Sequence, residues 1–164
     1  MLSQAVLKAL NDQINFELYS GYIYLSMAAY FETKNLKGCA TWMRAQAKEE
    51  HSHAMRIYDF IVKRMGAVKL AAIAGPKTAW ESPLAAFQDA LKHEQAVTKR
   101  INSLVALAGK ENDTATGIFL QWFVTEQLEE EEQTDEIVQK LRMIKDSANG
   151  LFMIDHALGK RTEG

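Results

Sequence analysis

The chain has 164 residues, 48% of them hydrophobic, and carries a formal net charge of −2, which suits one compact domain over residues 1–164 and is too little for two. No Lys- or Arg-rich stripe follows the chain, so nucleic acid is not an expected partner. A single cysteine, Cys39, excludes an intramolecular disulfide and a paired-cysteine metal site.

The first predicted helix precedes a break at residues 32–38. It opens with MLSQAVLKALNDQ, which alternates polar and apolar residues and lacks the unbroken apolar core of a signal peptide. Its most apolar stretch, residues 21–31, is about half the roughly 20 residues that a membrane-spanning helix needs. Together with the lone cysteine, which suits a reducing compartment, these features predict a cytoplasmic protein with no membrane partner.

Further breaks at residues 66–83, 108–113 and 146–150 divide the rest of the chain into three more long helices and a short fifth one. Both prolines, Pro76 and Pro83, lie in the first of these breaks. Ser82 followed by Pro83 provides an N-cap and a first-turn proline for the third helix. No strand alternation is present, so the sequence predicts an all-α fold.

Apolar residues recur at alternate spacings of three and four in each long helix, which is typical of the seam of a packed bundle. Polar residues interrupt every seam near its middle: Glu17 in the first helix, Glu50 and His53 in the second, Glu94 in the third, and Gln127 and Glu130 in the fourth. Burying one unpaired carboxylate costs several kcal/mol, against about 5 to 15 kcal/mol for the stability of a typical domain. Lys and Arg are absent from the middle of the seams, so a metal ion is the better compensation.

The depth of these residues along the helices predicts that they meet in one layer. Glu17 lies about 16 residues before the end of its helix and Glu50 about 14 after the start of the next, so an antiparallel pair brings them level. The segment 66–83 is long enough to cross the bundle, which lets the second and third helices run parallel in an up-down-down-up arrangement.

Glu50 and His53 are three residues apart on one helical face and can ligate the same cation. Carboxylates with a single imidazole suit iron or manganese better than zinc. The layout that follows has one metal on Glu17, Glu50 and His53, with Glu50 bridging to a second metal on Glu94 and Glu130, and Gln127 nearby as a weak ligand or a donor to the ligands. Tyr24, seven residues after Glu17, faces the same side and is a candidate to hydrogen-bond a ligand or pass an electron.

These residues, Glu17, Tyr24, Glu50-x-x-His53, Glu94 and Gln127-x-x-Glu130, on four long helices and a short fifth, resemble the non-haem ferritins of bacteria over essentially the whole chain. The resemblance implies a shell of twenty-four subunits that takes up Fe(II). It implies oxidation at a dinuclear ferroxidase centre by dioxygen or hydrogen peroxide, and storage as a ferric oxy-hydroxide mineral. It also implies a third iron site on Glu49, Glu126, Glu129 and the shared Glu130.

Related families fit less well. Bacterioferritins carry a second Glu-x-x-His where this chain has Gln127-x-x-Glu130, and a haem-ligating methionine where it has Ser52, so no haem is expected. Rubrerythrins need several cysteines, and mini-ferritins lack the fifth helix. Two other functions stay open from the residues: an enzyme with a permanent di-iron or di-manganese cofactor acting on a small molecule or peroxide, and a protein that holds one divalent ion for stability only.

Overall fold

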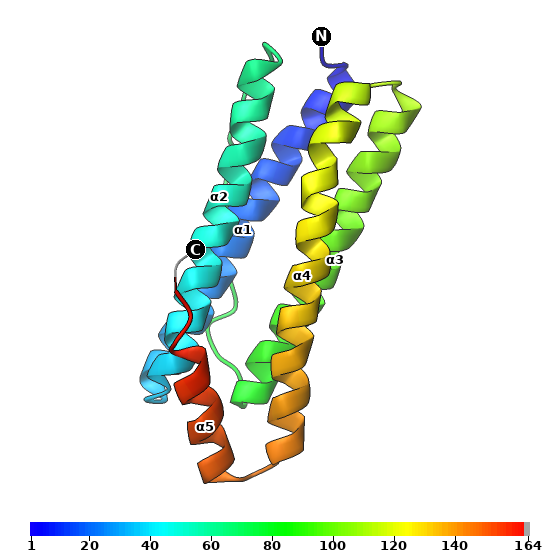
Figure 1. Ribbon diagram of the computed structural model, residues 1–164. Helices are drawn as coiled ribbons and strands as arrows, with labels where there is room; N and C mark the ends of the chain where they lie inside the picture. The colour runs from blue at the N-terminus through cyan, green and yellow to red at the C-terminus, as the bar shows by residue number, and fades with distance from the viewer. Residues whose placement is uncertain (163–164) are drawn as a thin grey trace.

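The computed structural model describes residues 1–162, and the last two residues of the predicted domain lie outside that range. Within it the chain forms five helices and no strand: α1 (Gln4–Thr33), α2 (Lys37–Lys63), α3 (Pro83–Lys110), α4 (Thr114–Ile144) and α5 (Ala148–Leu158) (Figure 1). This confirms the all-α prediction with four long helices and a short fifth. In the part of the chain described, no helix combines the length and the hydropathy needed to cross a membrane.

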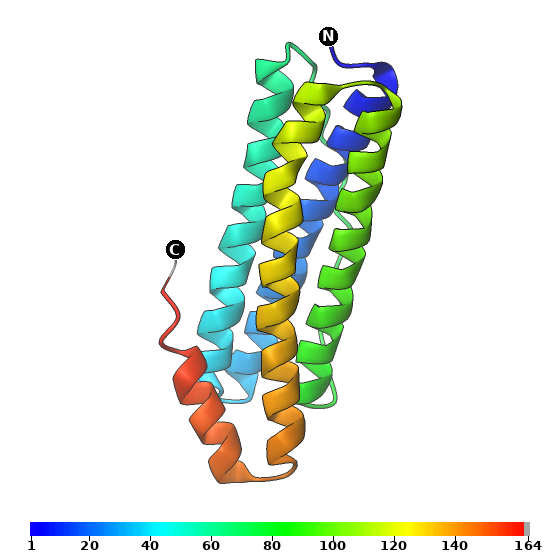
Figure 2. The same cartoon turned by 45° about the vertical axis from the view of Figure 1, so that its right-hand side comes forward.

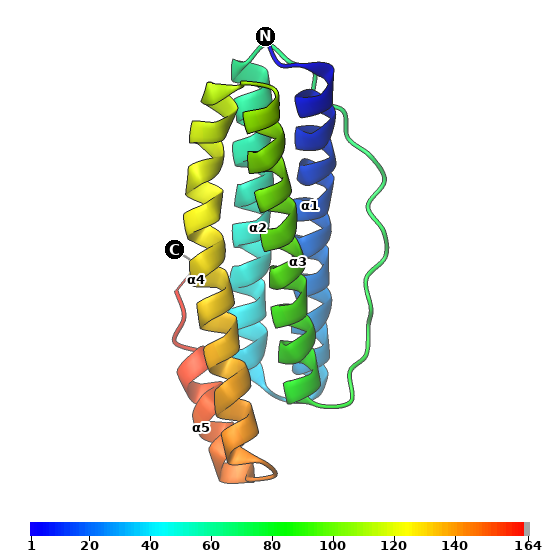
Figure 3. The ribbon, with the colours of Figure 1, turned by 90° about the vertical axis from the view of Figure 1, so that its right-hand side faces the viewer.

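The four long helices form a bundle in which α1 packs chiefly against α2, and α3 against α4 (Figure 2). Residues 64–82 carry the chain back along the outside of α1, so that α3 starts at the same end of the bundle as α2 and runs parallel to it (Figure 3). The up-down-down-up arrangement predicted from the length of this segment is therefore confirmed.

Polar residues on the outer face of α1 hold the crossover segment in place. The Asn11 amide donates to the Ala67 carbonyl at 3.1 Å, and the Ser26 hydroxyl donates to the Lys77 carbonyl at 2.6 Å. These bonds satisfy backbone groups of an irregular segment that has no secondary structure of its own.

Side-chain caps begin four of the five helices, whereas α2 borrows its cap from α5. Ser82 accepts from the Ala85 amide at 3.0 Å, as predicted for the start of α3. Leu36, at the start of α2, provides no side-chain cap. The Asp155 carboxylate of α5 instead accepts from the Cys39 amide at 2.8 Å, which ties the short helix to the bundle.

Two apolar clusters fill the bundle, one on each side of its middle. The cluster nearer α5 includes Tyr24, Phe31, Met43 and Phe87. The cluster at the other end includes Leu10, Ile14, Ile57, Ile101 and Leu120. Between them lies a layer of buried polar side chains that all four long helices supply.

Lys145, in the turn between α4 and α5, has φ 51° and ψ −121°, a conformation that favours glycine. The Ser147 amide donates to the Ile144 carbonyl at 3.0 Å, so the turn is closed and Lys145 is held in this conformation. We expect Lys145→Gly to stabilise the metal-free protein by about 1 kcal/mol, or roughly 2–4 °C in Tm. Thermal unfolding measures the gain, and Lys145→Ala is the control. An equal gain in the alanine variant would show that loss of the side chain, rather than relief of strain, is responsible.

Candidate metal centre

The buried polar layer contains four glutamates and one histidine drawn from the four long helices. Glu17 and Glu94 are 0% exposed, Glu50 is 1%, Glu130 is 2% and His53 is 3%. Each lies on the core-facing stripe of its helix, at the level where the two apolar clusters meet. So many buried acids need a counter-charge or protons to remain in one core.

Ligand-type atoms in this layer form three groups, and within each group the atoms lie within 4.8 Å of one another. The groups are Glu17–Glu50–His53, Glu50–Glu94–Glu130 and His53–Glu126–Glu130. Neighbouring groups share Glu50, His53 or Glu130, so the three positions adjoin. The first two correspond to the dinuclear layout predicted from the sequence, and the third lies on the side of Glu126.

Three of the four buried glutamates have at least one oxygen fixed by a neutral donor. Gln13 Nε2 donates to Glu17 Oε1 at 3.0 Å, Gln46 Nε2 to Glu130 Oε2, Tyr24 Oη to Glu94 Oε1, and Gln127 Nε2 to Glu94 Oε2 at 3.1 Å. Neutral amide and hydroxyl donors orient a carboxylate without cancelling its charge, so the negative charge remains available to a cation.

Glu50 differs from the other three. Within the described residues, both of its carboxylate oxygens are inaccessible and lack a hydrogen-bond partner, and so does Oε2 of Glu17. Leaving such groups unpaired costs free energy that the protein would recover only if something else bound them. Glu50 belongs to two of the three groups, so its carboxylate adjoins both of them.

The Gln13 amide has only one orientation that fits its neighbours. Arg100 Nε donates to Gln13 Oε1 at 3.0 Å, and the guanidinium lies 4.2 Å from the Phe16 ring centroid. Since Oε1 faces the arginine, Nε2 must face Glu17. Arg100 thereby fixes, through Gln13, which oxygen of Glu17 is left for a ligand.

Tyr24 is fully buried beside Glu94. Burial first, and then the negative charges of Glu94, Glu50 and Glu130, raises the pKa of Tyr24 well above its usual value. The phenol therefore keeps its proton and donates a hydrogen bond to Glu94. Its ring also packs edge-on against Trp42 at a centroid distance of 6.5 Å.

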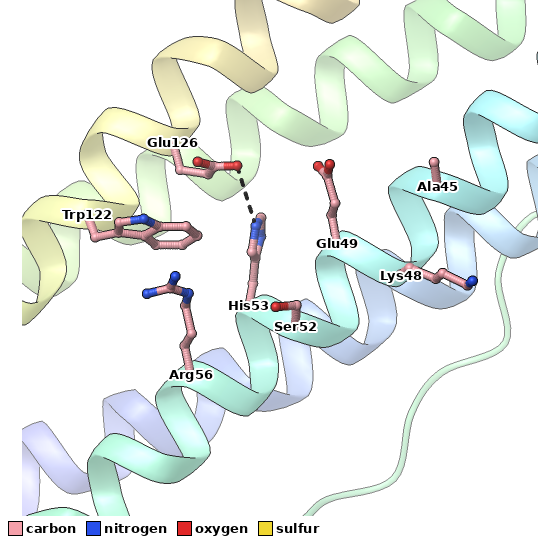
Figure 4. A pocket seen from close by; sticks show the side chains of 8 residues that line it. All are labelled: Ala45, Lys48, Glu49, Ser52, His53, Arg56, Trp122 and Glu126. Atoms are coloured by element: carbon pink, nitrogen blue, oxygen red, sulfur yellow. Dashed lines mark ion pairs between the residues drawn. The ribbon is translucent and has the colours of Figure 1, made fainter. Parts of the chain in front are cut away.

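The His53 imidazole points one nitrogen toward each side of the centre. Nδ1 lies 3.3 Å from Glu50 Oε2 but outside hydrogen-bonding geometry, and Nε2 lies 3.7 Å from Glu126 Oε1. Beyond Nε2 is a cavity of about 280 Å³, which Glu49, His53 and Glu126 line together with Arg56 and other residues (Figure 4). This cavity connects the buried layer with the surface of the bundle between α2 and α4.

Of the four residues predicted for a third iron site, only two lie together in a ligand group. Glu126 and Glu130 lie in one group with His53, which the sequence-based set of four glutamates did not include. Glu49 lines the cavity, but its Oε1 pairs with Arg161 Nη2 at 3.0 Å. Glu129 is exposed and belongs to none of the three groups found among residues 1–162.

Burial and mutual repulsion raise the pKa of several acids in the layer. Burial raises the pKa of Glu94 to about 7, against the hydrogen bonds from Tyr24 and Gln127 that lower it. Burial and the charge of Glu94 raise the pKa of Glu130 to about 9, and those two causes with Glu17 raise that of Glu50 well above its usual value. The metal-free centre therefore holds protons at neutral pH, and a bound cation must displace them.

A pH dependence of stability follows from these shifts. Each raised pKa favours the protonated folded state, so its contribution is complete below about pH 4.5 and is lost as the pH rises through 7 for Glu94 and 9 for Glu130. We expect the metal-free protein to lose roughly 3 kcal/mol or more between pH 5 and 9, by denaturant unfolding. Saturating Zn(II) should reverse the trend, and Glu130→Gln should flatten it above pH 7. An unchanged slope in that variant would contradict the assignment.

Sequence reasoning missed three residues that act on the predicted ligands: Gln13, Gln46 and Arg161. A signal existed for the two glutamines, because each lies four residues before a buried glutamate, Glu17 or Glu50, on the same helical face. No local pattern marks Arg161. The structure brings most of the predicted ligands together, and their role as ligands stays a prediction.

The chain matches the family model for the ferritin-like domain over residues 7–144. It is 42% identical over 161 residues to a bacterial non-heme ferritin of Bacteroides fragilis, covering 98% of this chain and all of the relative. It is 40% identical over 162 residues to a bacterial non-heme ferritin of Staphylococcus aureus, covering 99% of this chain and 98% of the relative.

Solved structures agree with these relatives. An engineered closed form of the Archaeoglobus fulgidus ferritin superposes with a TM-score of 0.99 at 49% identity, covering all of both chains. The open pore ferritin of the same archaeon gives a TM-score of 0.98 at 49% identity, covering 99% of this chain and all of that one. With a buried layer of carboxylates and one imidazole on four matching helices, the chain belongs to the ferritin family.

Proposed function

We propose that this ferritin stores iron and that it oxidises Fe(II) at a dinuclear ferroxidase centre within each subunit. The observation that carries the proposal is Glu50, whose two buried oxygens lack hydrogen-bond partners within residues 1–162 and which belongs to two adjoining ligand groups. The relatives named as non-heme ferritins support the same function.

In this centre Glu17, Glu50 and His53 would hold one Fe(II), and Glu50, Glu94 and Glu130 the other. Gln13 and Gln46 orient Glu17 and Glu130. Gln127 Nε2 donates to Glu94 and Thr98, so this residue orients Glu94. Two Fe(II) give up two electrons, which with two protons reduce dioxygen to hydrogen peroxide, or hydrogen peroxide to water.

Glu126 and Glu130 support a third iron position beside the pair, on the far side of His53, with Glu49 and Glu129 at its margin. The charges of Glu129 and Glu49 contribute to the raised pKa of Glu126, after burial as the largest cause, so both carboxylates lie near enough to attract a cation toward this position. Iron there lies between the dinuclear centre and the cavity, where it can give further electrons or pass onward to the mineral.

Tyr24 is assigned a catalytic role through Glu94. Its hydroxyl donates to Glu94 Oε1 and so fixes one ligand oxygen of the second iron. When an electron leaves the phenol, the same hydrogen bond gives its proton a buried acceptor, so Tyr24 is placed to supply an electron to a nearby oxidant.

The shell of twenty-four subunits and the cytoplasmic location belong to this proposal. Large apolar side chains stay exposed on one chain: Tyr22, Leu25, Leu70 and Ile73 on α1 and the crossover, and Phe152 and Met153 on α5. Exposed apolar surface of this extent supports burial against further copies of the chain. The lone buried Cys39 fits a reducing compartment.

The cavity beside His53 argues against a cofactor enzyme with an organic substrate. Its volume of about 280 Å³ is small for an organic ligand, and Lys48, Glu49, Arg56 and Glu126 line it. Binding sites for organic molecules are usually larger and mostly apolar. A charged cavity of this size suits a hydrated cation and dioxygen or peroxide.

Anaerobic loading of the metal-free protein with Fe(II), followed by exposure to air, tests the function. We expect fast oxidation of two to three iron ions per subunit, followed by retention of many more in a large assembly, measured by ferric absorbance and by iron content after gel filtration. If uptake stops at about two iron ions and no further iron is retained, the chain is a cofactor enzyme instead.

A further inference from the structure

Arg161, after the end of α5, is fixed against α2 by three contacts. Its Nη2 lies 3.0 Å from Glu49 Oε1, its Nη1 lies 3.5 Å from the Trp42 carbonyl oxygen, and its guanidinium lies 4.7 Å from the Trp42 ring centroid. The side chain is only 15% exposed. Figure 1 shows residues 159–162 lying beside α2, which brings the Arg161 cation to this helix.

Glu49, the partner of Arg161, also acts on the group proposed for the third iron. It lines the same cavity as His53 and Glu126, and Figure 4 shows the three side chains in the space between α2 and α4. The charge of Glu49 contributes to the raised pKa of Glu130, after burial and the charge of Glu94, so Glu49 acts electrostatically on that ligand. Glu49 therefore stands between two positive charges, the guanidinium and any cation bound beside Glu126.

We propose that Arg161 is a displaceable counter-ion for the third cation position, and that the guanidinium and a divalent cation compete for Glu49. The inference rests on the proposed function, because the third cation position that Arg161 would regulate is part of that proposal. A divalent cation held by Glu126 and Glu130 gains Glu49 Oε1 as a further ligand atom only when Arg161 releases that oxygen. While Arg161 holds Glu49, the third position keeps fewer ligands and binds its cation more weakly.

The physical setting makes the displacement feasible. The Glu49 side chain is 30% exposed, so water screens its ion pair with Arg161 and the pair is weak. Arg161 lies three residues beyond the last residue of α5, so its release disturbs no helix. The doubly charged cation is meanwhile attracted by several carboxylates at once.

Calorimetric titration of the metal-free protein with Zn(II), which cannot be oxidised, measures the affinity at each position. For Arg161→Ala we expect the third equivalent to bind about tenfold more tightly, because both a competitor and a nearby positive charge are removed. The first two equivalents should keep their affinity. Lys160→Ala is the matched control, since it removes an exposed positive charge from the adjacent residue, and it should change the third affinity by less than about twofold.

A second pair of variants separates competition for Glu49 from a structural effect of the tail. Glu49→Gln should weaken the third equivalent while the first two remain, and Arg161→Ala in that background should gain less than it gains alone, because the carboxylate that the two cations share is gone. The inference is overturned if Arg161→Ala weakens the third equivalent, leaves it unchanged, or shifts all three alike, or if a third equivalent is not bound. Failure to bind the first two equivalents would instead overturn the dinuclear centre, so the two failures are distinguishable.

Discussion

Glu50→Gln should make the metal-free protein more stable while Fe(II) oxidation falls by at least ~100-fold. The glutamate is 1% exposed, and within residues 1–162 both of its oxygens lack hydrogen-bond partners, so it destabilises the metal-free fold. An amide of the same shape is neutral without taking up a proton, and it can donate to Glu17 Oε2, which also lacks a partner. We expect a gain of about 2 kcal/mol or more at pH 7.5, seen as a rise of several degrees in Tm.

The loss of oxidation has a separate cause, since a neutral amide cannot bridge two cations as a carboxylate does. Changing groups that merely orient metal ligands already costs about 10–100-fold, so loss of the bridging ligand should cost at least the upper end of that range. Glu132→Gln, the same change at an exposed position of α4, should alter neither property. Lower stability of the metal-free Glu50→Gln protein, or unchanged oxidation, would contradict the bridging assignment.

The buried polar layer could be predicted because it depends on residue spacing within each helix. Apolar residues recur every three or four positions along each helix. The spacing alone therefore shows which face of the helix a polar residue lies on and how far along the bundle it lies. Glu17 and Glu94 are 0% exposed and Glu130 is 2%, as the interrupted seams indicated. The antiparallel pairing then needs only helix lengths and a rise of about 1.5 Å per residue.

Glu129 is a residue for which the sequence-based assignment to the third iron site is less accurate. It follows Leu128 and precedes Glu130 on one continuous helix, and successive residues are rotated by about 100° around the axis. Glu130 is buried whereas Glu129 is exposed, so adjacent carboxylates of the same run face different surroundings. A resemblance assigned both to one site, but the structure places only Glu130 in a ligand group with His53 and Glu126.

The contacts that α5 and Arg161 make with α2 could not be predicted, because the three- and four-residue spacing acts only within one helix. Asp155 caps α2 from 116 residues away, and Arg161 contacts Trp42 from 119 residues away. Neither residue lies on an apolar seam of a long helix. Residue spacing along a single sequence does not determine where a short helix such as α5 packs across the end of a bundle. The path of α5 depends instead on one small residue at the start of α2, Gly38.

Gly38→Ala should displace α5 from the bundle, and we expect it to cost about 3 kcal/mol or more of docking free energy. A β-carbon at Gly38 would lie 1.7 Å from the Asp155 carbonyl oxygen and 3.0 Å from the Gly159 amide nitrogen. Both are backbone atoms, so no side-chain rotation relieves the overlap. Moving α5 away also removes the Asp155 cap from the Cys39 amide.

Limited proteolysis and hydrogen exchange over residues 148–162 measure the displacement directly. Gly117→Ala is the matched control, because nothing lies within 4 Å of its added β-carbon and the residue is helical, so that variant should be neutral or slightly more stable. If Gly38→Ala protects α5 as well as the parent chain does, the close approach of the two helices does not determine the position of α5.

Displacement of α5 also links this glycine to the third cation position. Arg161 reaches Glu49 only while α5 is docked, so Gly38→Ala should bind the third Zn(II) more tightly, as Arg161→Ala does. The two changes should not add, because each frees the same carboxylate. Additive gains would mean that α5 influences the centre by a route other than Arg161.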